Sequence, residues 1–446
     1  MVSMTRKKYF SVIFTLAWPA FIELTLTQLT NLVDLAMIGQ LGTWALSAVG
    51  FTTQPKQIML TVFIAVNTGA TALVARYTGS GEHDKVNRVF NQAIILNIAG
   101  GIILSILGFI LSEQFVIWMG ATDPKIIDAA TSYLQIQMSG MTFIAVSTCI
   151  TACLRGIGNT KVAMMYNVAA NVINVILNYM LIYGKFGMPR LEVSGASLAT
   201  ITGQTIACFI AIFYMIKSKN IFSFKLNLKV DRLISNSMLK VGLPAMGEQV
   251  IMRVGMLIFA VMIARLGTLA NGTHQVCMSI LGFSFMIGQA FAVSATTLVG
   301  QKLGEKKPDE ASRYGMYSTW IAVFVSIVVG IAFILFNRQI IDLFSNDIDV
   351  INLGSKVVMV LGLVQPIQAI QFTLTGALRG AGDTLFAAVV TMITAVGVRL
   401  LFSYIFVFIL GWGLMGAWIA LFCDQTIRTV VIIIRYIGGK WKSIKI

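Results

Sequence analysis

An isolated acidic residue stands out in an apolar stretch near the start of the chain. Asp34 lies within the segment L-V-D-L-A-M, residues 32–37. A carboxylate in such a place can take up a proton or bind a cation, and an ionisable side chain at membrane depth is a functional candidate by default. The structural alternative is a salt bridge to Lys56 or to an arginine. We expect a functional role for Asp34.

A second polar group follows further along the chain. Asn167, Asn171, Asn174 and Asn178 are spaced by four, three and four residues, which places four amides on one face of a helix. These amides either line a wet cavity or join neighbouring helices by hydrogen bonds. Carboxylate, amide and hydroxyl oxygens are the ligands that hard cations take. The candidate cation site for H⁺ or Na⁺ has four members: Asp34, Asn174, Asn178 and Thr200.

Two further glutamates occupy equivalent places in the sequence. Glu23 follows Pro19 by four residues, and Glu248 follows Pro244 by four. A proline inside a helix frees a backbone carbonyl and permits a bend. Glu23 and Glu248 therefore have either a structural role in capping such a bend or a functional one, and we place Pro19 and Glu23 at a bend of the first helix.

The last two apolar segments carry three charged residues. Asp424 and Arg428 are four residues apart, so we expect them to neutralise one another on one helix face. Arg399 is expected to pair with Asp424 or with Glu248. A possible polar site in the second half of the chain thus consists of Glu248, Arg399 and Asp424.

The elements that must position these residues are transmembrane helices. The 446 residues are 57% hydrophobic and only 11% charged, whereas soluble domains carry about 25% charged residues. Twelve apolar segments are long enough to span a bilayer, which takes roughly 20 residues. They lie near 12–38, 46–74, 90–111, 129–153, 162–183, 193–216, 236–264, 275–300, 315–337, 353–377, 384–410 and 414–436.

The second half of the chain repeats the first. W-P-A-F-I-E at 18–23 returns as L-P-A-M-G-E at 243–248, and L-R-G-I-G-N-T at 154–160 returns as L-R-G-A-G-D-T at 378–384. Asp34 corresponds to Phe259, so the second half lacks this acid. The predicted fold is an all-α membrane protein with twelve helices in two six-helix lobes, related as a parallel repeat. The N-lobe is 1–216, a cytoplasmic linker 217–235, and the C-lobe 236–446.

The distribution of basic residues predicts the topology. Of the 33 Lys and Arg residues, 23 fall in predicted loops on the side of the N-terminus, six on the other side and four inside helices. By the positive-inside rule, both termini face the cytoplasm of a multi-pass cell-membrane protein. The net charge of +15 therefore reflects topology, and we expect no nucleic-acid partner.

The sequence contains no motif for a resident cofactor. The phosphate-binding pattern G-x-x-x-x-G-K-[ST] is absent, and the five cysteines lie in apolar segments without metal-ligand spacing. We expect no cofactor and no enzymatic activity, with H⁺ or Na⁺ as a coupling ion.

Together, these motifs resemble the multidrug and toxic compound extrusion (MATE) antiporters. The resemblance includes the two Pro-x-x-x-Glu helix starts, the helix ends L-V-A-R at 73–76 and L-V-G-Q at 298–301, and N-V-I-L-N-Y-M-L-I-Y-G at 174–184. In this family the helix-1 aspartate is the N-lobe cation site, which carries over to Asp34, with Asn174 and Asn178 as its helix-5 positions.

The chain also departs from parts of the family pattern. Some relatives have an aspartate where this chain has Asn178, so one charge is lost here. Other relatives use a C-lobe pair of acids on helices 7 and 10. Glu248 matches the first acid, but helix 10 offers only glutamines: Gln365, Gln368 and Gln371.

The resemblance implies an antiporter that exports amphipathic, mostly cationic drugs or toxic compounds in exchange for H⁺ or Na⁺. We expect small organic cations and membrane lipid as its partners, and a monomer as its state. The alternative within the same architecture is a flippase for lipid-linked precursors, whose pyrophosphate would need basic residues such as Lys56, Arg253 and Arg399. A membrane-embedded enzyme or receptor is a third possibility, which the repeat and the lack of a catalytic cluster disfavour.

Overall fold

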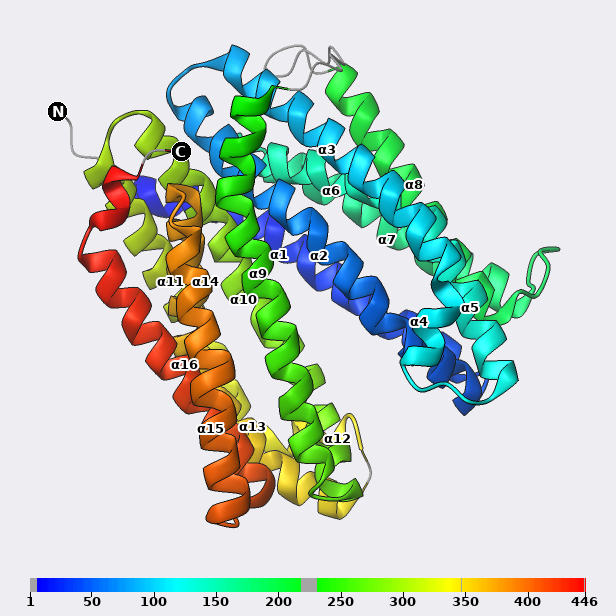
Figure 1. Cartoon of the computed structure of the whole chain (residues 1–446). Helices are drawn as coiled ribbons and strands as arrows, with labels where there is room; N and C mark the ends of the chain where they lie inside the picture. The colour runs from blue at the N-terminus through cyan, green and yellow to red at the C-terminus, as the bar shows by residue number, and fades with distance from the viewer. Residues whose placement is uncertain (1–5, 218–230, 346, 445) are drawn as a thin grey trace. The chain divides into compact units, whose positions relative to one another are not determined.

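The described part of the protein consists mostly of helices joined by short turns. The computed structural model describes residues 6–217, 231–345, 347–444 and 446, and these contain helices and no strands (Figure 1). A helix satisfies its backbone polar groups within one segment, which apolar segments in lipid require. The predicted all-α membrane fold is confirmed.

Internal packing divides the chain into two compact units. The N-unit comprises Ile22–Gly242, and the C-unit comprises Met1–Phe21 together with Leu243–Ile446. Two long helices, α1 (Arg6–Gly39) and α9 (Arg232–Ala264), contribute residues to both units. The lobe and linker boundaries drawn from the sequence stay predictions, and residues 218–230 of the linker lie outside the described residues.

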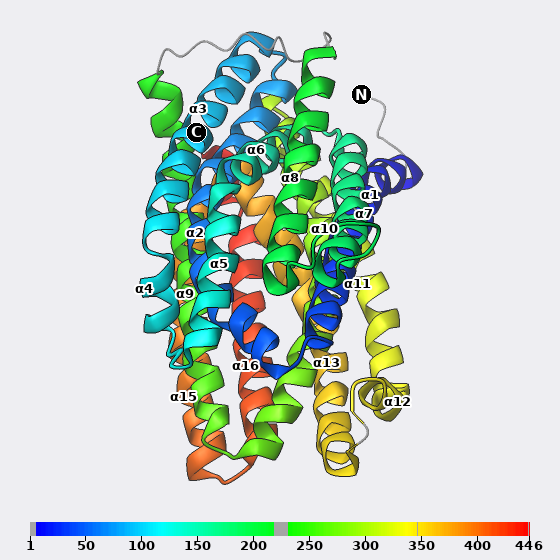
Figure 2. The same cartoon turned by 90° about the vertical axis from the view of Figure 1, so that its right-hand side faces the viewer.

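The N-unit is a helical bundle. Its complete helices are α2 (Thr43–Gly79), α3 (His83–Ile110), α4 (Ser112–Trp118), α5 (Pro124–Ser139), α6 (Met141–Gly156), α7 (Thr160–Tyr183) and α8 (Glu192–Lys217). In Figures 1 and 2, α2 runs beside α3 and α7 runs beside α8.

The C-unit is a second bundle with one interrupted helix. Its elements are α10 (Thr268–Gly304), α11 (Pro308–Leu335), α12 (Asn337–Asp342), α13 (Ile348–Ala381), α14 (Thr384–Met392), η1 (Ile393–Val398), α15 (Arg399–Tyr404), η2 (Ile405–Ile409), α16 (Gly413–Ile437) and η3 (Lys440–Ser443). The segments η1 and η2 are π-helical, and η3 is a 3₁₀ turn. In the sequence these π segments read as ordinary apolar helix.

The number of candidate membrane spans agrees with the twelve predicted. Eleven helical segments in the described part of the chain are long and apolar enough to cross a bilayer. The twelfth is a broken pair, α5 and α6, which bend by 49° at Gly140 and cover the predicted span 129–153.

Local sequence sets the limits of α7, which carries the four asparagines. Asn159 caps its start, because its side-chain oxygen accepts a hydrogen bond from the Val162 amide at 3.4 Å. Gly184 ends it in the left-handed region, with φ of +67°, a conformation that favours glycine. The amide face is thereby held in one uninterrupted helix.

Glycines allow close helix packing in the N-unit. A Cβ atom on Gly242 of α9 would lie 1.6 Å from the Ala65 carbonyl oxygen of α2, and one on Gly69 would lie 2.1 Å from the Met238 carbonyl oxygen. Only residues without a side chain permit the backbones of α2 and α9 to approach so closely.

Candidate functional site

The predicted cation-site residues of α1, α7 and α8 lie together in the N-unit. The Asn178 amide donates a hydrogen bond to Asp34 Oδ1. The Asn174 amide can be oriented in two ways. In one orientation its nitrogen donates to Asp34 Oδ1 at 3.0 Å, and its oxygen accepts from the Thr200 hydroxyl at 3.1 Å. The Asp34 carboxylate of α1 thus accepts from α7, and Thr200 of α8 reaches it only through Asn174.

One oxygen of this group has no partner among the described residues. Asn178 is fully buried, and its Oδ1 makes no hydrogen bond. A buried amide oxygen without a donor is costly. A carboxylate and a neighbouring amide oxygen are both oxygen ligands. A hard cation could bind to both, and a proton on the carboxylate could donate to the amide oxygen. The residues present therefore fit a small cation.

Asp34 has no ion pair to neutralise it. No lysine or arginine in the described residues lies within 4.0 Å of its carboxylate. Lys56 of α2, which is half-buried, interacts with Asp34 electrostatically but does not bind it directly. The salt-bridge alternative from the sequence is therefore not what the structure contains.

The other two asparagines of the face join α7 to α1. Asn167 donates to Glu23 Oε1 at 2.9 Å, and Asn171 donates to the Thr27 hydroxyl at 3.1 Å. The single amide face therefore makes two kinds of contact. Its first half connects helices, and its second half surrounds Asp34.

Glu23 and Glu248 make equivalent ion pairs in the two units. Glu23 binds Arg155 at 2.8 Å, and Glu248 binds Arg379 at 2.7 Å. The arginines belong to the repeated L-R-G motif and lie in the last turns of α6 and α13, respectively. The third partner is also equivalent, because Thr391 donates to Glu248 at 3.2 Å as Asn167 donates to Glu23.

The sequence did not predict that arginines would pair with Glu23 and Glu248. The repeated L-R-G motif, which contains both arginines, was the available signal. The recorded hydrogen bonds of the Glu23 carboxylate go to side chains of α6 and α7. Pro19 lies inside α1 as expected.

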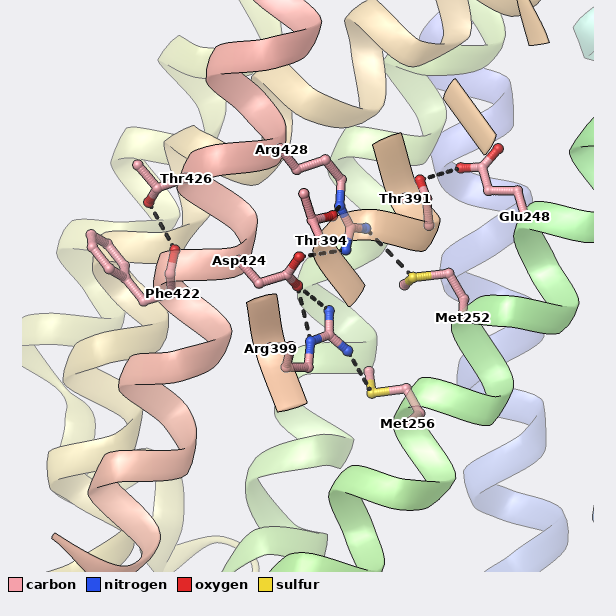
Figure 3. Close-up of polar contacts among 10 residues, drawn as sticks. All are labelled: Glu248, Met252, Met256, Thr391, Thr394, Arg399, Phe422, Asp424, Thr426 and Arg428. Atoms are coloured by element: carbon pink, nitrogen blue, oxygen red, sulfur yellow. Dashed lines mark hydrogen bonds and ion pairs between the residues drawn. The ribbon is translucent and has the colours of Figure 1, made fainter. Parts of the chain in front are cut away.

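The predicted polar site of the C-unit separates into two groups (Figure 3). Asp424 of α16 binds Arg399 through Nε at 2.9 Å and Arg428 through Nη2 at 2.7 Å. Glu248 makes its own bonds to Arg379 and Thr391. The pairing of Asp424 with both arginines confirms the expectation, whereas the recorded bonds do not connect Glu248 to Asp424.

A family model named MatE matches the chain twice. The matched residues are 19–180 and 244–405, which are the two copies of the repeat. The chain belongs to the MatE family. It is a membrane transporter with multiple spans, and its two copies of the family segment carry the Asp34 group and the Glu248 ion pair, respectively.

Curated relatives match nearly the whole length of the chain. It is 30% identical over 429 residues to the probable multidrug resistance protein NorM of Thermotoga maritima, covering 96% of this chain and 92% of that protein. It is 28% identical over 439 residues to the uncharacterized transporter YisQ of Bacillus subtilis, covering 97% and 95%.

Solved structures share the fold. The outward-facing conformation of a multidrug resistance MATE family transporter of the MOP superfamily matches with a TM-score of 0.90 at 21% identity, covering 96% of each chain. A MATE crystal structure in the bent conformation matches with a TM-score of 0.89 at 21% identity, covering 97% of this chain and 96% of that one.

Proposed function

We propose that this MatE transporter is a secondary antiporter that exports amphipathic, mostly cationic drugs or toxic compounds in exchange for H⁺ or Na⁺. The observation that carries the proposal is the Asp34 group. Among the residues that the structure describes, the Asp34 carboxylate has no ion pair, and it lies beside an amide oxygen that no donor reaches, inside an apolar bundle. The names of curated relatives as multidrug resistance proteins support the substrate class.

The two amides suit a site that exchanges its cation. An asparagine side chain can present its nitrogen to a carboxylate or its oxygen to a cation. When the carboxylate is ionised, Asn174 and Asn178 donate to it. When Na⁺ is bound, their oxygens can serve as ligands, and when a proton is bound, the carboxyl group can donate to one of them.

The coupling ion acts through differential affinity. It can bias the transporter between two states only if it binds one of them more tightly. Asn167 and Asn171 connect α1 to the same face of α7 that surrounds Asp34. Neutralising Asp34 would therefore change how the C-terminal half of α1 is held, while the Glu23–Arg155 pair holds α1 about three turns earlier.

The rest of the proposal follows from composition. Basic residues concentrate in the loops on the N-terminal side, which supports cytoplasmic termini in the cell membrane. We propose a monomer, because one chain already supplies both repeats, with no cofactor beyond the coupling ion. A flippase for lipid-linked precursors is less well supported, since Asp424 pairs with Arg399 and Arg428 and leaves this group with less positive charge than a pyrophosphate carries negative charge.

The proposal is tested by efflux of rhodamine 123, a fluorescent organic cation, from proteoliposomes. A proton gradient and a sodium gradient are imposed in separate experiments, with protein-free liposomes as the control. Efflux that depends on protein and on one of the gradients would support the antiporter and name the ion. Equal dye release with and without protein under both gradients would contradict it.

A further inference from the structure

The C-unit contains a buried group of charges that the proposed cation exchange does not use. Asp424, Arg399 and Arg428 have side chains that are 1% exposed or less. Two guanidinium groups share one carboxylate, so this group has a net charge of +1. An uncompensated charge inside an apolar bundle is costly, which makes it a functional candidate.

The internal repeat relates this group to the N-unit cation site. G-Q-T-I-A at 203–207 corresponds to D-Q-T-I-R at 424–428, so Asp424 replaces a glycine and Arg428 replaces an alanine. Phe259 stands where the N-unit has Asp34, and the Arg399 guanidinium lies 6.0 Å from its ring centroid. The polar group of the N-unit therefore has its aspartate in the first helix of the repeat, Asp34 in α1, whereas that of the C-unit has it in the last, Asp424 in α16.

The π-helical segments shift the register between α7 and its counterpart by one residue. Thr160 and Thr384 are 224 residues apart. Gly195 of α8 lies against the Leu181 backbone, and its repeat mate Gly416 lies against the Phe406 backbone. Leu181 and Phe406 therefore correspond to one another, and they are 225 residues apart. A π segment accommodates such an extra residue, and π segments occur frequently at functional sites.

With this shift, Arg399 stands at the place of Asn174. The contacts agree, because a Cβ on Gly203 would lie 3.4 Å from the Asn174 side chain, and the counterpart of Gly203, Asp424, binds Arg399. The C-unit thus has a fixed guanidinium where the N-unit offers amides to an exchangeable cation.

Each guanidinium has one donor that reaches only a weak acceptor. Arg399 Nη1 lies 3.2 Å from the Met256 sulfur, and Arg428 Nη1 lies 3.5 Å from the Met252 sulfur. Figure 3 shows both methionines on α9, facing the arginines across the group. A thioether is a weak hydrogen-bond acceptor on a flexible side chain. An anion could displace it and gain two charged donors.

We propose that Arg399 and Arg428 form an anion site that binds the carboxylate of zwitterionic substrates, with Met252 and Met256 as its movable cover. The inference rests on the proposed export function and assigns to these two arginines the part of the site that would hold a substrate carboxylate. A planar guanidinium matches a carboxylate in shape and donor geometry. The net positive charge disfavours a second cation at this place.

The test uses two dyes that differ only at the carboxylate. Rhodamine 110 has a free carboxylate, and rhodamine 123 is its methyl ester. Removing either arginine would leave Asp424 less well paired and disturb folding, so the variant instead adds a tethered anion, Met256→Glu. Met256→Gln has the same shape without the charge and serves as the matched control.

The readout is the ratio of rhodamine 110 efflux to rhodamine 123 efflux from proteoliposomes. We expect Met256→Glu to lower this ratio about tenfold or more, since its carboxylate would occupy the donors, a loss typical of one charged contact. Met256→Gln, whose neutral amide oxygen can reach the same donors without a charge, should lower the ratio clearly less than Met256→Glu does. An unchanged ratio in Met256→Glu would overturn the anion site.

A chloride arm separates a substrate carboxylate from a free anion. Replacing gluconate by chloride should leave the ratio of the two dyes within about twofold if the substrate itself supplies the carboxylate. If chloride instead changes efflux of both dyes equally, the site binds a free anion and the proposal for substrates is wrong. Failure of wild-type rhodamine 123 efflux would count against the export function itself.

Discussion

Neutralising Glu23 and its repeat mate Glu248 should destabilise the protein by similar amounts. Glu23→Gln removes the charge that Arg155 faces at 2.8 Å, and Glu248→Gln does the same to Arg379 at 2.7 Å. The glutamate side chains are 8% and 6% exposed, and the arginines 21% and 27%. Two independent copies of one interaction are therefore present in the same chain.

The expected magnitude follows from this partial burial. A hydrogen bond to a charged group contributes about 1.5–3 kcal/mol, and the quarter-exposed arginines place these pairs toward the lower end because water screens them. We expect a coupling free energy of about 1–2 kcal/mol for each pair in a double-mutant cycle. The two values should agree within about 0.5 kcal/mol, the usual error of additivity.

The assay is a denaturant titration in mixed micelles of each single variant and of Glu23→Gln/Arg155→Gln and Glu248→Gln/Arg379→Gln. Coupling below about 0.5 kcal/mol in both cycles would refute a structural role for the pairs. Coupling in only one cycle would refute the equivalence of the two units. Loss of transport without loss of stability would assign the glutamates to function.

Two further predictions concern packing and pH. Gly242→Ala should lower the unfolding temperature in detergent, because its Cβ would meet the Ala65 carbonyl oxygen. Gly247→Ala should not lower it, because nothing lies within 4 Å of its Cβ. Equal effects of the two substitutions would contradict the close α2–α9 packing. Glu305 lies directly after α10. Its partial burial raises the pKa of its carboxyl group, but hydrogen bonds from Lys302 and Lys307 outweigh this effect and hold the pKa below its usual 4.5. Its contribution to stability is therefore complete above about pH 4.5 and lost as the pH falls through the lowered pKa. Wild type and Glu305→Gln should accordingly differ in unfolding temperature at pH 7 and converge in acid, and a constant difference would contradict this.

Much of the N-unit site could be predicted from the sequence. An acid in an apolar segment and amides at helical spacing are unusual enough to identify Asp34, Asn174 and Asn178 as one group. Spacing fixes only which residues share a helix face. It does not determine that Asn167 would reach Glu23, while Asn178 would reach Asp34.

The C-unit shows what sequence reasoning could not supply. The π segments in 393–409 have the same apolar composition as the helices around them, so no local signal marks the one-residue shift. The pairing of Arg399 with Asp424 was one of the two alternatives expected from the sequence, but its correspondence to the Asn174 position follows only from this shift. The partners of Glu23 and Glu248 were visible in the repeated L-R-G motif, but pairing residues more than 130 positions apart requires the fold.

The central claim is that Asp34 couples an ion gradient to export, and one comparison tests it most directly. Rhodamine 123 efflux from proteoliposomes is measured under the effective gradient for wild type, Asp34→Asn and Asp84→Asn, an exposed aspartate of α3. We predict that gradient-driven efflux falls about tenfold or more in Asp34→Asn, as the loss of a charged contact implies, and stays at the wild-type rate in Asp84→Asn. Wild-type efflux in Asp34→Asn would contradict the account.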